Sequence, residues 1–365
     1  MKKKITILPG DGIGKEVTAS GKKVLEQIAE CFGHDFIFDY AVIGHEAIET
    51  TGNPLPDETL LKLKNSDAIL FGAVGHPKYD NDPHAKIRPE QGLLKMRKEL
   101  GLYANLRPIK LFDELLAASS IKADILRGAD ILFFRELTGD VYFGERGRKD
   151  NNNTAFDTMI YSRYEVERIA HKAFKAALTR KKKLTSVDKA NVLESSRLWR
   201  EVVQEVAKQY PDVVVEHMFV DSAAMKLIQS PTSFDVVVTG NLFGDILTDE
   251  ASQIAGSMGM LASASIGDTV GLYEPIHGSA HDITGKGIAN PLASILSAAL
   301  LLDISFGLKE EADAIIRAIE QTLKEGYRTR DIADAGTPLE KILGTEVMGN
   351  IVCNNIRMHI SVESK

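Results

Sequence analysis

Short apolar runs alternate with longer amphipathic segments along the chain, and this alternation limits the possible folds more than any other feature. Short apolar runs are typical of strands buried in a sheet, and segments with a helical period bury one face against it. The alternation therefore predicts an α/β fold. The expected strands are Ile5–Leu8, Asp67–Val74, Ala129–Phe134, Leu184–Val187, Val213–Val220 and Phe234–Thr239. The expected helices are Gly14–Cys31, Pro56–Lys64, Ser162–Arg180, Ser195–Gln209, Asn290–Phe306 and Lys309–Glu325.

The length of 365 residues allows two domains. No internal repeat, low-complexity segment or linker marks a boundary between them. The sequence therefore favours a domain built from distant segments over domains joined in series.

The composition excludes several classes of function. Apolar residues make up 44% and charged residues 26%, as in an ordinary soluble globular protein. The formal net charge of −7 argues against a nucleic-acid or anionic-membrane partner. No apolar stretch approaches the ~18–20 residues of a membrane span, and the chain opens on a strand-like segment instead of a signal peptide. Cys31 and Cys353 form neither a metal motif nor a disulfide framework, so we expect a cytoplasmic enzyme.

A strand followed by a helix with two carboxylates is the most informative motif for function. The apolar run Phe234–Thr239 ends at Gly240 and Asn241, and a helical pattern containing Asp245 and Asp249 follows. A separation of four places both carboxylates on one helix face, about 5–6 Å apart at Cβ. Their repulsion favours a cation between them, and oxygen ligands suit Mg2+ or Mn2+. The spacing alone leaves a solvated acidic helix face open as the alternative.

Polar residues stand just beyond the ends of several predicted strands, namely Arg135, Lys189, Asp221 and Asn241. In α/β sheets the ligand crevice lies outside the carboxyl ends of the strands. Any one of these residues is consistent with a surface loop, but four together predict a common pocket.

Residues 136–160 have a different pattern. Tyr142–Arg146 and Ala155–Tyr161 are strand-like, and the polar segment Asp150–Asn153 between them is typical of a turn. A lone two-stranded ribbon is not independently stable. We therefore expect an arm at about residues 140–160 that packs in a dimer interface.

A glycine-rich turn, Pro9–Gly14, follows the first predicted strand. Its G-x-G-x-G spacing lacks the G-x-G-x-x-G that places a helix N-terminus at a pyrophosphate, and no Gly-Lys-Ser/Thr follows. We therefore reject a Rossmann fold and a Walker loop, and expect a tight strand-to-helix turn near the functional cleft.

The segments Glu274–Asp282 and Gly285–Pro291 are the better candidate for a cofactor site, because their small residues allow close approach of a ligand to the backbone. Asp282 could accept hydrogen bonds from a ribose diol and would repel a 2′-phosphate, which favours NAD over NADP. Asn290 also fits a helix N-cap followed by proline at the first helical position, and the two roles are compatible.

Beyond these patterns, the chain resembles a known family, the isocitrate/isopropylmalate dehydrogenases, which are β-hydroxyacid oxidative decarboxylases. The resemblance covers essentially the whole chain and rests on separate motifs in the same order. These are Leu8–Gly14, Arg88–Leu94 with Arg97, Leu102–Pro108, Arg135–Tyr142, Val187–Asn191, Asn241–Asp249, Glu274–His277 and Gly285–Pro291.

The resemblance implies a two-domain α/β fold with mixed sheets, with residues 1–102 and 256–365 in the first domain, residues 103–255 in the second, and the cleft between them. It implies NAD-dependent oxidative decarboxylation of 3-isopropylmalate to 4-methyl-2-oxopentanoate in leucine biosynthesis. Hydride leaves C2, and Mg2+ or Mn2+ then assists the loss of carbon dioxide. The expected assembly is a homodimer with shared active sites.

The resemblance also assigns roles by position. Arg97, Arg107 and Arg135 match carboxylate-binding arginines, whose guanidinium groups suit that bidentate task. Lys189, from the neighbouring subunit, matches the residue that helps to remove the hydroxyl proton, and Tyr142 matches the one that protonates the product. The expected metal ligands are Asp221 of the neighbouring subunit, which also contacts substrate, and Asp245 and Asp249. The expected cofactor residues are Glu274, His277, Gly278, Ser279, Ala280, Asp282, Ile283 and Asn290.

Substrate identity within the family depends on one short segment. Leu93 and Leu94 offer apolar surface to an isopropyl group, whereas isocitrate-type members place serine in this segment. Glu90 would repel a third substrate carboxylate. The chain departs from the family pattern at His281, which stands where a proline is usual beside the adenosine site.

Three alternatives stay open at this point. The segment Glu90–Leu94 disfavours a tartrate/D-malate- or isocitrate-type enzyme of the same family. A non-catalytic regulatory subunit would have lost ligands, yet the aspartates, the arginines, Lys189 and Tyr142 are intact. A Mg2+-dependent phosphohydrolase would explain the aspartate pair alone, but no phosphate-binding or nucleophile motif accompanies it.

Overall fold

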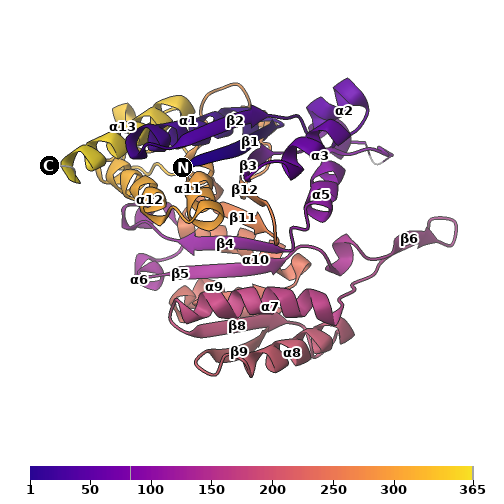
Figure 1. Ribbon diagram of the computed structural model, residues 1–365. Helices are drawn as coiled ribbons and strands as arrows, with labels where there is room; N and C mark the ends of the chain where they lie inside the picture. The colour runs from indigo at the N-terminus through magenta and orange to yellow at the C-terminus, as the bar shows by residue number, and fades with distance from the viewer. Residues whose placement is uncertain (83, 364–365) are drawn as a thin grey trace. The chain divides into compact units, whose positions relative to one another are not determined.

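The computed structural model describes residues 1–82 and 84–363 (Figure 1), and the chain divides into two compact units. Unit 1 comprises Met1–Gly101, Phe112–Ala118 and Ala255–Lys365, and unit 2 comprises Leu102–Leu111 and Ser119–Ile254. Each unit combines helices with a sheet of mixed direction, which confirms the predicted α/β class.

Among its described residues, unit 1 contains five strands in the order β2-β1-β3-β12-β11. The pairs up to β12 are parallel, and β11 runs antiparallel to β12. The strands are β1 (Lys2–Gly10), β2 (Asp35–Tyr40), β3 (Ala68–Ala73), β11 (Ala262–Ile266) and β12 (Gly271–Pro275). The helices are α1 (Gly14–Phe32), α2 (His45–Thr51), α3 (Asp57–Lys64), α4 (Pro77–Asp80), α5 (Pro89–Glu99), α11 (Leu292–Leu300), α12 (Lys309–Lys324) and α13 (Thr345–Glu363). Helices α1, α11, α12 and α13 pack on one another and bury the apolar face of α1.

The larger sheet of unit 2 has five strands among the described residues, in the order β4-β5-β10-β8-β9. Its strand pairs are parallel except for β4 with β5, which is antiparallel. The strands are β4 (Ala104–Lys110), β5 (Asp130–Glu136), β8 (Lys183–Asp188), β9 (Val214–Phe219) and β10 (Val236–Thr239). The helices are α6 (Ala123–Leu126), α7 (Arg163–Leu178), α8 (Glu194–Ala207), α9 (Val220–Gln229) and α10 (Asn241–Ala255). Helices α7 and α8 pack side by side against the sheet (Figure 1).

The six predicted strands and six predicted helices all form, with ends shifted by a few residues. The helix predicted to reach Phe306 ends as α11 and continues into a π-helical turn, Leu301–Ser305. Four strands escaped prediction for local reasons. Polar residues and a proline interrupt β4, alanine and serine fill β11, β12 is short, and β2 alternates at a sheet edge.

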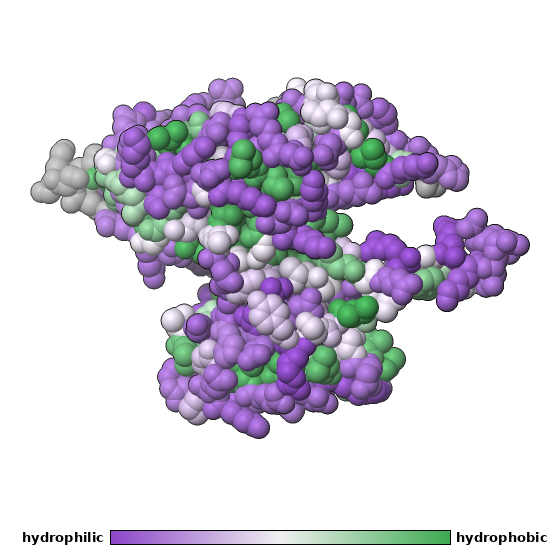
Figure 2. All heavy atoms as spheres, turned by 45° about the vertical axis from the view of Figure 1, so that its right-hand side comes forward, coloured by the Kyte–Doolittle hydropathy of each residue, from purple (hydrophilic) through white to green (hydrophobic). Residues whose placement is uncertain are grey.

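A two-stranded ribbon projects from the rest of unit 2 (Figure 1), with β6 (Arg146–Lys149) paired to β7 (Thr154–Asp157). Hydrophilic residues cover its tip (Figure 2). The predicted strand ends are wrong, because Tyr142 lies in a 3-10 turn and residues 158–161 are not in a strand. Both Tyr142 and Tyr161 instead make hydrogen bonds to α10, and these tertiary contacts override their strand propensity.

Within residues 1–82 and 84–363, none of the helices combines the length and the apolar character that crossing a bilayer requires.

Candidate active site

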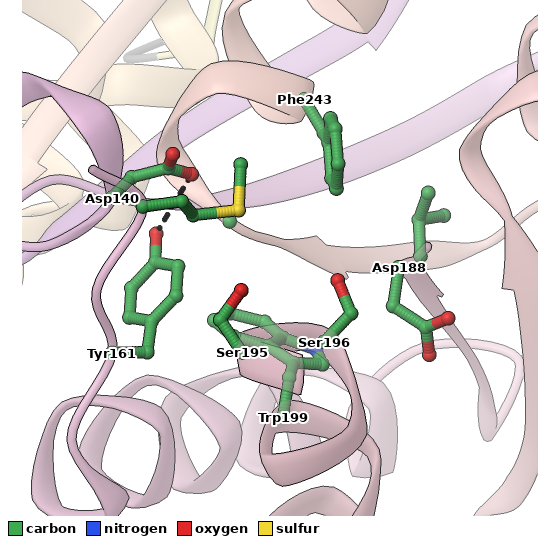
Figure 3. Close-up of a pocket in the computed structure, with 10 residues that line it drawn as sticks. Asp140, Tyr161, Asp188, Ser195, Ser196, Trp199 and Phe243 are labelled. Carbon is green, nitrogen blue, oxygen red and sulfur yellow. Dashed lines mark hydrogen bonds between the residues drawn. The ribbon is translucent and has the colours of Figure 1, made fainter. Parts of the chain in front are cut away.

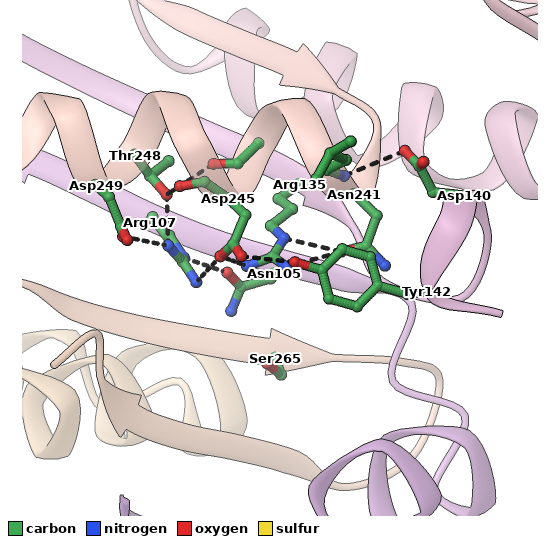
Figure 4. A network of polar contacts seen from close by, with 12 residues as sticks. Asn105, Arg107, Arg135, Asp140, Tyr142, Asn241, Asp245, Thr248, Asp249 and Ser265 are labelled. Carbon is green, nitrogen blue, oxygen red and sulfur yellow. Dashed lines mark hydrogen bonds and ion pairs between the residues drawn. The ribbon is translucent and has the colours of Figure 1, made fainter. Parts of the chain in front are cut away.

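Arg107 on β4 is buried among oxygen acceptors (Figure 4). Its Nε donates to Asn105 Oδ1 at 2.6 Å, and its Nη1 donates to Thr248 Oγ1. Its guanidinium lies 3.6 Å from Asp245 Oδ1 and 3.6 Å from Asp249 Oδ1. Residues two apart on a strand share a face, which is why Asn105 can hold Arg107. The fold therefore orients this guanidinium by contacts of its own.

Arg135, at the carboxyl end of β5, lies against the first turns of α10 (Figure 4). Its Nε and Nη2 donate to Asn241 Oδ1 at 3.0 and 2.8 Å, and its Nη1 donates to Asp245 Oδ1. Tyr142 donates its hydroxyl to Asp245 Oδ2 at 2.7 Å. A Cβ at Gly244 would lie 2.7 Å from Cγ of Arg135, so glycine at this position lets the arginine approach the helix.

The two arginines balance the charge of the two aspartates on α10. Both guanidinium groups are buried, whereas the side chains of Asp245 and Asp249 are 36% and 55% exposed. Partial burial raises the pKa of Asp249; Arg107 opposes this shift and Asp245 adds to it. The acidic pair therefore belongs to a polar cluster with buried cations, which differs from a merely solvated helix face.

Lys189 and Asp221 form a second cluster, and Lys189 Nζ donates to Asp221 Oδ1. This hydrogen bond is the main reason that the pKa of Asp221 is lowered. The backbone at Lys189 is fixed by Ser196 Oγ, which accepts its N–H at 3.1 Å. The preceding Asp188 (Figure 3) accepts two hydrogen bonds from Arg200, at 2.8 and 2.7 Å. Lys189 thus follows a strand end that is held by these hydrogen bonds, and its ammonium group is already paired with Asp221.

The donor set on α10 fits a hard divalent cation. Asp245 and Asp249 provide carboxylate oxygens one helical turn apart, and oxygen ligands are those that Mg2+ and Mn2+ prefer. In the part of one chain that the structure describes, no three histidine, cysteine, aspartate or glutamate side chains gather into a metal site. Asp221 is therefore not a third ligand to this pair within one chain.

Arg97 on α5 is buried and donates through Nη2 to Glu274 Oε1 at 3.1 Å. Its Nε is also buried but has no hydrogen-bond partner among the described residues. A buried donor without a partner is costly. This atom therefore fits an anionic ligand.

One face of α5 carries Glu90, Leu93, Leu94 and Arg97, because their spacings of three, four and seven residues match the helical period. Glu90 is exposed, and both leucines are half-buried. The helix thus presents an acidic, an apolar and a cationic group in sequence along one side.

The loop that follows β12 rests on the glycine-rich turn. Ile13 donates its N–H to Ser279 O at 2.9 Å, and a Cβ at Gly12 would lie 2.7 Å from the Ser279 carbonyl carbon. The φ of Gly12 is +57°, which favours glycine. The predicted tight turn is confirmed, and its close backbone approach supports the loop that contains the expected cofactor residues.

His277 and Asp282 leave polar atoms available in this loop. The Nδ1 of His277 donates to Gly278 O at 2.9 Å, and its Nε2 is buried without a partner among the described residues. Burial lowers the pKa of His277 and so favours the neutral ring, whose Nε2 can accept a hydrogen bond. Asp282 is exposed. These groups, with open space beside Gly278, fit a ligand that carries hydroxyl and amide donors.

Three of the expected cofactor residues have tasks in the fold. Glu274 pairs with the α5 arginine, and Ile283 packs against the first turn of α1. Asn290 donates to Asp331 Oδ2 at 3.0 Å and accepts the N–H of Leu292 at 3.0 Å. The side chain of Asn290 therefore has the predicted capping role, although α11 begins at Leu292, one residue beyond the proline.

His281 ties the same loop to the segment after β3. Its Nε2 donates to Gly75 O at 2.6 Å, and its ring meets that of His76 edge-on, with centroids 4.5 Å apart. A histidine at this position thus supplies a hydrogen bond that proline could not make.

Comparisons with known proteins identify the family of this chain. The sequence model of the isocitrate/isopropylmalate dehydrogenase family matches residues 4–352. The chain belongs to this family. Proteins named 3-isopropylmalate dehydrogenase are 57% identical in Shouchella clausii, over 96% of this chain and 97% of that protein, and 58% identical in Rhodopirellula baltica, over 96% and 98%. The crystal structure of isocitrate dehydrogenase from Methylococcus capsulatus is 34% identical, with a TM-score of 0.86 over 97% of this chain and 99% of that one.

Several residues that hold the charged groups in place were not predicted as site residues from the sequence. They are Asn105 and Thr248 around the arginines, Asp188, Ser196 and Arg200 around Lys189, and Asp140 and Tyr161 at the start of α10. Only Asn105 carried a local signal, since it stands two residues from Arg107 on a strand. The others meet their partners across the fold.

Proposed function

We propose that this protein is an NAD-dependent 3-isopropylmalate dehydrogenase that decarboxylates its substrate in leucine biosynthesis. The observation that carries the proposal is the α10 cluster, in which Arg107 and Arg135 face Asp245 and Asp249, with Tyr142 beside them. Buried arginines suit the carboxylates of a malate, and the aspartates suit the cation that polarises its C2 oxygen. Relatives more than 50% identical carry the same name.

The chain's own residues divide the chemistry between them. Arg107 and Arg135 bind carboxylate with guanidinium groups that are already oriented, which lowers the entropy cost of alignment. Lys189 takes part in removing the C2 hydroxyl proton, and Tyr142 delivers a proton to C3 after carbon dioxide has left. The loop with His277 and Asp282 would hold NAD, which would supply the hydride acceptor. Asp245 and Asp249 would hold Mg2+ or Mn2+, which would supply Lewis-acid stabilisation of negative charge on oxygen.

In this proposal the face of α5 that carries Glu90, Leu93, Leu94 and Arg97 selects the side chain of the substrate. Leu93 and Leu94 provide apolar contact for an isopropyl group, Arg97 offers its unpaired Nε to a carboxylate, and Glu90 repels a third carboxylate. Because apolar pockets discriminate one methylene by only ~1–3 kcal/mol, other 3-alkylmalates should also react.

The cofactor preference follows from charge. Asp282 is exposed on the loop that also presents His277 Nε2, and a carboxylate there accepts ribose hydroxyls but repels a 2′-phosphate. We propose NAD over NADP for this reason.

We propose a homodimer in which Lys189 and Asp221 enter the partner's active site together. The two side chains already contact each other within one chain, so they would arrive as one unit. In this arrangement unit 2 is the dimerisation domain, and unit 1 carries most of the cofactor site.

Two experiments test the proposal. The first compares NADH formation from 3-isopropylmalate, isocitrate and D-malate, with NAD and with NADP; preferred turnover of isocitrate or D-malate would reject the substrate assignment. The second mixes subunits of Lys189→Ala and Asp245→Ala, each inactive alone. If Lys189 acts across the interface, mixed dimers regain one intact site, and activity returns to about a quarter of wild type. No recovery in dimers proven to be mixed would place Lys189 and Asp245 in the same chain's site.

A further inference from the structure

Helix α10 begins without a capping side chain of its own, because the residue before it is Gly240. The first N–H groups of a helix have no partner within the helix. Here Tyr161 Oη accepts the N–H of Asn241 at 2.8 Å, and Asp140 Oδ2 accepts the N–H of Leu242 at 3.1 Å. A Cβ at Gly240 would lie 3.1 Å from Tyr161 Oη and 3.2 Å from Asp140 Oδ2, so glycine leaves room for both. Two residues distant in sequence thus serve as the cap.

Asp140 holds this position in a conformation that few side chains adopt. Its φ is +74° and it is only 1% exposed. Aspartate tolerates this region better than most residues, but the conformation still has an energetic cost. The surroundings fix it, since Asp140 N donates to Ile160 O at 2.9 Å and Asp140 Oδ1 accepts the N–H of Val141 at 2.7 Å. The strained residue is therefore held by its cap contact and its own turn.

Tyr161 is fixed just as firmly (Figure 3). Its ring meets Trp199 edge-on at 5.3 Å between centroids, and its hydroxyl donates to Asp140 Oδ2 at 3.4 Å. Burial raises the pKa of Tyr161 well above its ordinary value, so the hydroxyl keeps its proton. The donor and acceptor roles in the cap are thus constant.

The capped helix carries the groups on which the proposed reaction depends. Asn241 holds Arg135, and Asp245 stands one turn further along α10. Asp140 also begins the short turn Asp140–Tyr142, from which the Tyr142 hydroxyl reaches Asp245 Oδ2. One residue therefore sets both sides of the contact between Tyr142 and Asp245.

We infer that Asp140, supported by Tyr161, is a positioning residue of the active site: it fixes the first turn of α10 and the Tyr142 turn relative to each other. This inference rests on the proposed function for its kinetic consequence. Its structural part, the ordering of Asp245, concerns the chain alone and is measurable without substrate.

The test uses full-length Asp140→Gly, Asp140→Asn and Tyr161→Phe, with Lys182→Gly as the matched control. Lys182 also has a positive φ, +56°, but lies exposed in the turn after α7, outside the ribbon and the site. Glycine relieves the backbone at 140 while removing the cap, whereas asparagine keeps an acceptor and tolerates the same φ. The readouts are amide hydrogen exchange at Asn241–Asp245, affinity for Mn2+ alone, and kcat and KM for 3-isopropylmalate.

We expect Asp140→Gly to speed exchange in the first turn of α10, to weaken Mn2+ binding about tenfold, and to lower kcat about 10- to 100-fold with KM changed far less. Asp140→Asn should recover most of each loss, and Lys182→Gly should match wild type. If Asp140→Gly does not fold, Tyr161→Phe should show the same three changes in smaller degree. Unchanged exchange and Mn2+ affinity in Asp140→Gly, or equal damage in the asparagine variant, would overturn the inference. Failure of wild type to turn over 3-isopropylmalate would reject the proposed function. The positioning role of Asp140 would then be judged from hydrogen exchange and Mn2+ affinity alone.

Discussion

Replacing Asp245 with asparagine should have opposite effects on the two proposed ligands of the site. Asp245 is the anion that both buried arginines face, at 3.6 Å from Arg107 and in direct hydrogen bond with Arg135. Asparagine keeps the shape and removes one negative charge. A cation should therefore bind more weakly, and a free dicarboxylate more tightly.

The size of the effect follows from the charge geometry. Two unit charges 4 Å apart interact by about 4 kcal/mol at an effective dielectric constant of 20. The side chain of Asp245 is 36% exposed, so solvent screening reduces this to about 1–2 kcal/mol. That corresponds to about tenfold tighter binding of 3-isopropylmalate in metal-free buffer. Mn2+ binding should weaken by at least about tenfold, since a charged ligand is also lost. The partly unpaired arginines should cost about 1–3 kcal/mol of stability.

Isothermal titration calorimetry measures both effects, with Mn2+ alone and with 3-isopropylmalate in the presence of a chelator. Asp212→Asn is the control, because Asp212 is an exposed aspartate of unit 2 whose ion pair with Lys182 is 3.8 Å long. It should change neither affinity. If Asp245→Asn binds the diacid no more tightly than wild type without metal, the arginines are not competing for Asp245, and the electrostatic reasoning fails.

Three further changes probe separate parts of the site. Tyr142→Phe should lower kcat about 10²- to 10⁴-fold, because it removes a proton donor, while the thermal unfolding midpoint stays near that of wild type. Rapid turnover of 3-isopropylmalate by this variant would exclude Tyr142 from proton transfer. Arg97→Met should raise KM about tenfold or more with a smaller effect on kcat, since it removes the charged donor with the unpaired Nε; an unchanged KM would place Arg97 outside the substrate site. Burial, with His45 and His281 nearby, lowers the pKa of His76 in the folded chain. The unfolded chain therefore takes up a proton on this histidine at higher pH than the folded chain does. The free energy of unfolding should thus fall as the pH drops below about 6.5. His76→Asn, which keeps an acceptor for the N–H of Lys78, should make the fall of the unfolding midpoint shallower, and an identical slope would contradict this origin.

The fold class and the main elements could be predicted because each depends on local patterns. The helix with Asp245 and Asp249 is an example, since an apolar strand, a glycine and a helical period in the sequence predict it. Strand β4 is the opposite case. Its residues Asn105 and Arg107 are polar and buried, because they belong to the candidate site. A search for apolar runs therefore does not detect this strand.

The residues of the candidate site were predicted as a set of charged groups, mainly through resemblance to a family. Their partners were not, because a hydrogen bond between Arg107 and Thr248 joins residues that are 141 positions apart. Asp140 shows the limit most clearly. Its aspartate would be assigned to a turn. Only the structure reveals its positive φ, its buried carboxylate and its hydrogen bond to the first turn of a helix that has no capping side chain of its own.

The opposing charges on α10 explain why a site of this kind needs such careful support. Arg107 and Arg135 neutralise Asp245 and Asp249 when neither ligand is bound, so the buried guanidinium groups are stable in the folded chain. A dication and a dicarboxylate together also add no net charge to the cluster. Either ligand alone would leave the cluster with a net positive or a net negative charge. Neutrality thus favours joint binding of the two ligands. It also requires that the carboxylates and the guanidinium groups stay at fixed separations while they exchange partners. Asn105, Thr248 and Asn241 meet that requirement by accepting hydrogen bonds from the two arginines without adding charge. The cap of α10 meets it by fixing the backbone of the helix that carries both aspartates.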